Sequence, residues 1–124
     1  YALFMALKEA HPGLSWNTWP APLVRREARA LADARASLQE SVDFHRFTQF
    51  AFYRQWTALR DYAHTRGIRI VGDIPFYVAF DSVDVWANPQ NFALMPETCQ
   101  PRLMAGVPPD YFSATGQLWG NPVY

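Results

Sequence analysis

The sequence predicts an α/β fold, because a long amphipathic helix is followed directly by a short apolar strand. From Asp43 to Arg66, apolar residues recur at helical spacing in two adjacent stripes. A wide apolar face of this kind is expected for a helix that packs on a sheet. Gly67 follows and can end the helix in the left-handed conformation. The run Ile68–Val71 then reads as a buried strand, so helix, tight turn and strand form one αβ unit.

Two more helices are expected before this unit. Residues 1–11 form a short helix that ends at Pro12-Gly13, and residues 14–22 make a connector rich in Trp and Pro. A second helix starts near Pro22, in the first turn where proline is tolerated, and keeps helical spacing as far as Val42. The phenylalanines of the third helix are expected in the core, since aromatic side chains dominate packing: Phe44, Phe47, Phe50 and Phe52.

The C-terminal third is expected to consist mainly of loops. Residues 81–87 predict a short helix capped by Asp81 or Ser82. Residues 92–94 and 102–105 are candidates for a small hairpin, and residues 107–121 are expected to be irregular. The chain is therefore divided into a mainly helical part (1–66), a strand with its following loop (67–80) and an inserted loop region (81–124), all within one domain.

Charge and cysteine content exclude several classes of protein. Eleven basic and eleven acidic residues leave no basic stripe for binding nucleic acid. No apolar run approaches the length of a membrane span. The single cysteine, Cys99, cannot form an intrachain disulfide, and no His/Cys spacing matches a metal site. A cytoplasmic protein is the expectation.

Two aspartates are candidates for a functional site. Asp73 follows the predicted strand, and a carboxylate in that position either faces a polar cleft or caps the turn through Ile74; the residues alone favour neither. Asp110 is a ligand candidate whose simpler role is that of a turn residue. Asp81 and Asp84 are three residues apart, but helix capping explains them better than acid–base chemistry.

Aromatic residues in the loops add a second kind of candidate. The candidates are Trp86, Tyr111, Phe112 and Trp119. The flat faces of their rings suit sugar rings, although packing inside the protein is the simpler role. Gln117 and Asn121 flank Trp119 at alternate positions, and their amides can both donate to and accept from hydroxyl groups. The alternative is a loop folded on its own indole.

Four blocks in the second half of the chain carry a family resemblance. They are GDIPFYVA at 72–79, DSVDVWA at 81–87, AGVPPDYFS at 105–113 and TGQLWGNP at 115–122. Together they resemble the amylomaltases, the 4-alpha-glucanotransferases of glycoside hydrolase family 77. Most relatives carry an Asp-Gly type turn where this sequence has Thr98-Cys99-Gln100.

The resemblance implies part of a (β/α)8 TIM barrel: the helix before the third barrel strand, that strand, and the inserted loops after it. A complete barrel needs about 250 residues, so the chain is expected to be an internal piece of a larger enzyme. The implied reaction is transfer of α-1,4-glucan segments with retention, and it requires neither metal nor cofactor.

The resemblance also implies roles for particular residues. The catalytic carboxylates are expected outside this chain, and Asp73 is expected to support them from the floor of the sugar-binding cleft. The implied partners are a maltooligosaccharide and the remainder of the barrel. The residues expected to bind substrate are Asp73, Tyr77, Asp110, Tyr111, Phe112, Gln117, Trp119 and Asn121.

Two other readings remain open. A non-catalytic carbohydrate-binding or interaction module would use the same aromatic loops, but one αβ unit alone leaves a sheet edge and an apolar helix face uncovered. A hydrolytic relative of the α-amylases is a weaker alternative, and the block GVPPDYFS argues against it.

Overall fold

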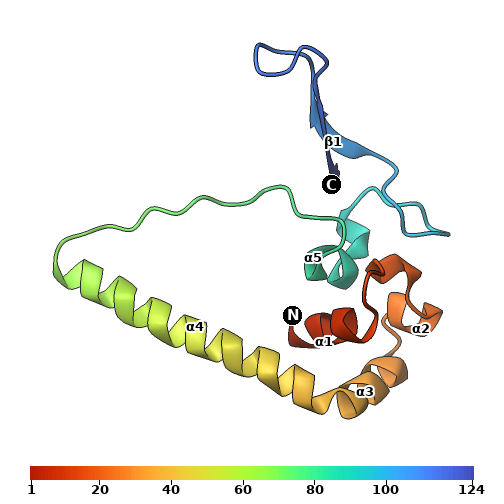
Figure 1. Ribbon diagram of the computed structural model, residues 1–124, viewed down its shortest axis with the longest axis horizontal. Helices are drawn as coiled ribbons and strands as arrows, with labels where there is room; N and C mark the ends of the chain where they lie inside the picture. Colours follow the sequence, from red (N-terminus) through yellow and green to blue (C-terminus); the bar gives the residue numbers. More distant parts are fainter.

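The computed structural model describes residues 1–124 as a helical region, a long extended segment and a two-stranded hairpin (Figure 1). It is thus a mixed helix-and-sheet structure. The helices are α1 (Ala2–Ala10), α2 (Ala21–Val24), α3 (Ala28–Ser37), α4 (Gln39–Thr65) and α5 (Val83–Ala87). Two 3₁₀ turns, η1 (Trp16–Thr18) and η2 (Pro89–Asn91), and two strands, β1 (Met104–Val107) and β2 (Gln117–Pro122), complete the list.

The core forms where α1 meets residues from four other segments. Helix α1 buries the face that carries Phe4 and Leu7. Phe4 packs against two indoles, with ring centroids 5.5 Å from Trp19 and 5.6 Å from Trp86. The other buried members of the cluster are Leu3, Ala6, Trp16, Leu31, Val42 and Val85. The Trp/Pro-rich connector is therefore a structural part of this core, because both of its tryptophans are buried.

The predicted second helix is wrong in its continuity, because the chain breaks between α2 and α3. Arg26 has a φ of 55°, in the left-handed region that non-glycine residues rarely adopt. Its guanidinium donates to the carbonyl oxygen of Ala87 at 2.5 Å and lies 5.1 Å from the centre of the Trp86 ring. These contacts with a distant segment offset the cost of the break, and local periodicity cannot reveal them.

Helix α4 confirms the strongest local prediction and ends where it was expected to end. Gly67 has a φ of 71°; its N–H donates to the carbonyl of His64, and the N–H of Ile68 donates to that of Ala63, both at 3.0 Å. This is the Schellman arrangement. With 27 residues, α4 is about 40 Å long at 1.5 Å per residue.

The expected burial of the α4 phenylalanines is wrong for this structure. Only Val42, His45 and Ala63 are buried along the helix, and more than half of each phenylalanine side chain is exposed, at Phe44, Phe47, Phe50 and Phe52. The physical reason is that α1 covers only the first turns of α4, and no other described element packs on the remaining face.

The strand predicted at residues 68–71 does not form within these 124 residues. The chain runs from α4 back towards α5 as an extended segment without strand pairing (Figure 1). Its apolar side chains are exposed, including Val71 at 91%. A strand needs a neighbouring strand to pair its backbone groups, and none of the described residues provides one here.

The hairpin forms from a different pair of segments than expected. β1 pairs antiparallel with β2, in the register Gly106 to Leu118 and Val107 to Gln117. Residues 107–121 are therefore not irregular throughout. The expected pairing of residues 92–94 with 102–105 is limited to a bridge between Leu94 and Pro101 and a hydrogen bond from the Arg102 N–H to the Ala93 carbonyl at 2.8 Å, and Met104 and Ala105 belong to β1 instead. Gly106 permits the β1–β2 approach, because a Cβ there would lie 2.5 Å from the carbonyl oxygen of Gln117.

Candidate functional site

Tyr77 and Trp119 form the centre of the candidate site. The Tyr77 ring comes from the extended segment and meets the Trp119 ring of β2 edge-on, with centroids 5.8 Å apart at 79°. Gln117 lies on the same face of the strand as Trp119, because side chains alternate, and its Oε1 accepts from the indole Nε1 at 3.0 Å. Trp119 remains 48% exposed, so much of its surface is free for a ligand.

Asn121 lies further along β2, in the stretch where the register with β1 is irregular and Gly120 is left-handed (φ 79°), and its side chain is engaged by the protein. Its Nδ2 donates to the carbonyl oxygen of Val78 at 2.8 Å. The alternating set Gln117, Trp119 and Asn121 is therefore ordered by bonds within the chain. The Gln117–Trp119 bond agrees with the alternative in which the loop folds on its own indole. Trp119 is nevertheless exposed enough to contact a ligand.

The connection between β1 and β2 presents two exposed aromatic rings. Asp110 Oδ1 accepts from the backbone N–H groups of Phe112 at 2.9 Å and Ser113 at 2.8 Å. The turn role of Asp110 is thus confirmed. Tyr111 and Phe112 at the tip are 93% and 86% exposed, and their ring centroids lie 5.5 Å apart. The turn holds both rings away from the core.

Asp73 lies apart from these groups on the exposed extended segment. Its Oδ1 accepts from the N–H of the next residue, Ile74, at 2.8 Å, the local contact expected if Asp73 has only a backbone role. No hydrogen bond joins Asp73 to the aromatic residues of β2 or to the β1–β2 connection. The structure brings Tyr77, Gln117 and Trp119 together and keeps Asp110, Tyr111 and Phe112 as a second group.

Two sequence interpretations need correction. Trp86 is only 4% exposed, and its Nε1 donates to the carbonyl of Leu23 at 2.9 Å, so it belongs to the core and cannot stack on a sugar. Of the two possible caps of α5, Ser82 is the one used, with its Oγ accepting from Val85 N at 3.4 Å. Asp81 instead accepts from Lys8 Nζ at 2.5 Å and from the N–H of Trp16 at 3.2 Å.

Two side chains that hold the segment carrying Tyr77 were not singled out by the sequence. Tyr124 Oη donates to the carbonyl of Phe76 at 2.6 Å, and Trp16 Nε1 donates to that of Phe80 at 2.8 Å. Both contacts join residues more than forty positions apart, so no local pattern signals them.

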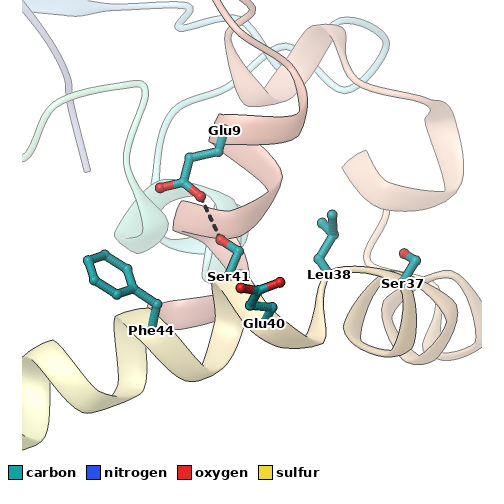
Figure 2. A pocket seen from close by; sticks show the side chains of 6 residues that line it. All are labelled: Glu9, Ser37, Leu38, Glu40, Ser41 and Phe44. Carbon is teal, nitrogen blue, oxygen red and sulfur yellow. Dashed lines mark hydrogen bonds between the residues drawn. The ribbon is translucent and has the colours of Figure 1, made fainter.

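A separate polar cluster joins α1 to α4. Glu9 Oε1 accepts from His45 Nε2 at 2.9 Å, and Glu9 Oε2 accepts from Ser41 Oγ at 2.5 Å. These hydrogen bonds, that from Ser41 first, lower the pKa of Glu9. A cavity of about 480 Å³ lies beside them, lined by Glu9, Ser37, Leu38, Glu40, Ser41 and Phe44 (Figure 2). Ser41 bonds to the carboxylate and not to the imidazole, so this is no pair of nucleophile and base.

The structure contains no group of three or more His, Cys, Asp or Glu side chains arranged to hold a metal ion. None of its helices combines the length and the apolar character needed to cross a membrane.

Exposed aromatic rings beside amide and carboxylate groups are typical of a carbohydrate-binding surface. Comparison with known proteins identifies the family more closely. The model of the glycoside hydrolase family 77, described as 4-alpha-glucanotransferase, matches residues 1–124. The chain therefore belongs to the 4-alpha-glucanotransferase family.

Individual relatives agree with this assignment. The chain is 60% identical over 124 residues to a 4-alpha-glucanotransferase of Thermus thermophilus and 58% identical over 124 residues to one of Synechocystis. Among solved structures, an amylomaltase from Streptococcus agalactiae in complex with acarbose matches 99% of the chain at 48% identity, with a TM-score of 0.93. In each case the chain spans 25% of the relative's length.

Proposed function

We propose that the complete protein is a 4-alpha-glucanotransferase that transfers α-1,4-glucan segments between maltooligosaccharides. The observation that carries the proposal is similarity along the whole of the chain to enzymes of that name. A related amylomaltase in complex with acarbose, matched over nearly all of this chain, supports an oligosaccharide substrate.

The proposed reaction is a double displacement with retention. A carboxylate forms a covalent glucosyl-enzyme, and the 4-hydroxyl of a second sugar then releases the glucan in place of water. We assign the nucleophile and the acid to residues outside these 124. Within the chain, Asp81 is already paired with Lys8, and Asp110 is used in a local turn. The reaction requires no metal or organic cofactor.

In this proposal the chain binds and encloses the glucan. Tyr77 and Trp119 offer ring faces, and Gln117 and the Oδ1 atom of Asn121 offer hydrogen-bonding groups beside them. Asp73 supports the reacting sugar from the extended segment. Asp110 shapes the turn that presents Tyr111 and Phe112 over the acceptor side.

The proposal also explains what covers the exposed apolar side chains of α4 and of residues 68–71. In the complete enzyme, residues 68–71 form the third strand of a (β/α)8 barrel, and the remainder of that barrel covers the exposed stripes of α4. Residues 81–124 are then an insertion after that strand, within the same catalytic domain as residues 1–66. We place the enzyme in the cytoplasm, where a lone cysteine such as Cys99 stays reduced.

Incubation of the complete enzyme with maltotriose tests the proposal. The expected products are glucose together with maltodextrins longer than maltotriose, separated by chromatography. Binding of maltotriose without any product would support the carbohydrate-binding module instead. Production of glucose and maltose alone would indicate a hydrolase and contradict the transferase.

A further inference from the structure

Three alternate carbonyl groups of the extended segment are each bound by a side-chain donor. The carbonyls belong to Phe76, Val78 and Phe80, and the hydrogen bonds are 2.6, 2.8 and 2.8 Å long. The backbone bends at Tyr77 and again at Phe80, so these three carbonyls belong to an irregular stretch of the segment. The donors, in the same order, are Tyr124 Oη, Asn121 Nδ2 and Trp16 Nε1.

These side-chain donors replace the backbone donors that carbonyls have in a sheet. In a sheet, the backbone N–H groups of an adjacent strand bind such a row of carbonyls. Here three side chains from two distant parts of the sequence do so. The segment ends at Asp81, whose carboxylate is bound by Lys8 and by the N–H of Trp16. Residues 76–81 are therefore fixed without belonging to a strand.

Each of the three donors is itself held in place. Trp16 is fully buried, and its ring lies 5.5 Å from that of Phe80. The ring of Tyr124 stacks on Phe92 with centroids 5.0 Å apart at 29°. Asn121 belongs to β2, the strand that also carries Trp119. The donors thus connect the segment to the core and to the hairpin.

The two hydrogen bonds nearest the candidate site flank Tyr77. The carbonyls bound by Tyr124 and Asn121 belong to the residues directly before and after it. Fixing the backbone on both sides restricts where the Tyr77 ring can lie, and that ring meets Trp119. We propose that Asn121 and Tyr124 are positioning residues, which set the Tyr77 ring against Trp119 to receive the glucan. This inference rests on the proposed function, since it takes Tyr77 as a glucan contact.

Two conservative variants of the complete enzyme remove these hydrogen bonds. Asn121→Asp keeps an acceptor oxygen for a sugar hydroxyl but loses the donor to Val78, and Tyr124→Phe keeps the stacked ring but loses the hydroxyl. Each is expected to raise KM for maltotriose about three- to tenfold, the effect of one hydrogen bond, with kcat changed less than twofold. The matched control is Asn17→Asp, which loses a similar bond to the Thr98 carbonyl away from Tyr77 and leaves KM unchanged.

A double-mutant cycle separates positioning from a purely structural role. If Asn121 acts through Tyr77, Asn121→Asp adds no further loss in kcat/KM once Tyr77→Ala is present. Independent, multiplicative losses would overturn the proposal. So would a lowered melting temperature with unchanged KM in both single variants. Should Asn121→Asp fail to fold, the same cycle with Tyr124→Phe decides.

Failure of the proposed function is recognised separately. If the wild-type complete enzyme forms no products from maltotriose, the transferase assignment falls. The positioning role is then decided by crystal structures of the wild-type and Asn121→Asp proteins. Loss of the edge-on contact between Tyr77 and Trp119 in the variant supports it, and an unchanged contact overturns it.

Discussion

His45 Nε2 donates to Glu9 Oε1 at 2.9 Å and thereby connects α4 to α1, the helix that covers its first turns. His45 is buried, whereas the Glu9 side chain is 55% exposed. Ser41, one turn earlier on α4, donates to the other carboxylate oxygen of Glu9. A single carboxylate thus holds two side chains of α4.

This arrangement predicts a pH dependence of stability. The bonds from Ser41 and His45 lower the pKa of Glu9 below its ordinary value of 4.5 in the folded state. A depressed carboxyl pKa stabilises the fold fully above the unfolded value and loses that effect as pH falls through the folded value. We therefore expect Glu9→Gln to lower the free energy of unfolding of the complete enzyme at pH 7, and by less at pH 4 and below.

Urea unfolding across this pH range measures the difference. The control is Glu40→Gln, since the Glu40 side chain lies beside the same cavity but its carboxylate makes no hydrogen bond within the protein (Figure 2). If Glu9→Gln lowers the free energy of unfolding equally at every pH, the charge of Glu9 does not contribute to stability.

Asp73→Asn in the complete enzyme tests the proposed supporting role of this aspartate. Asparagine retains an oxygen that can accept from the N–H of Ile74, so the turn contact seen here is preserved. We expect an unchanged circular dichroism spectrum and kcat/KM lowered at least tenfold, about 1.4 kcal/mol of lost transition-state stabilisation. Unchanged kinetics would leave Asp73 with the turn alone.

Sequence reasoning succeeded where the determining contacts are local. The end of α4 at Gly67 depends on a left-handed residue and two hydrogen bonds within five residues of it. The short helix α5 with Ser82 as its cap is equally local. The turn at Asp110 uses bonds from its side chain to the backbone of the second and third residues after it. Each of these was visible from residue type and spacing.

Sequence reasoning failed where contacts with distant segments determine the local structure. The break at Arg26 depends on Ala87 and Trp86, sixty residues further along. The apolar run 68–71 has the composition of a strand, but a strand forms only with a partner, and these 124 residues provide none. Of the candidate site, the contact of Tyr77 with Trp119 joins residues 42 positions apart, beside a hydrogen bond from Asn121 to the extended segment, and periodicity predicts neither contact.

The exposed position of Tyr111 leads to a prediction about the choice between water and sugar. A transferase has to keep water from the glycosyl-enzyme while it admits an acceptor. The turn at Asp110 holds the Tyr111 ring outward, 93% exposed, on a connection that begins with Pro108-Pro109. In the complete enzyme we expect this ring to cover the acceptor side.

Tyr111→Ala should therefore increase the ratio of hydrolysis to transfer, measured as reducing ends released per glucan transferred from maltotriose. Because the ring packs on little of the chain, the substitution should lower the free energy of unfolding by about 0.5 kcal/mol or less. The melting temperature should therefore hardly change. Leu118→Ala is the control, since Leu118 is also exposed but alternates to the other face of β2 from Trp119. Truncation of a buried aromatic side chain would instead lower the free energy of unfolding by about 3–5 kcal/mol. A loss of that size with an unchanged ratio would show that Tyr111 is a packing residue in the complete enzyme.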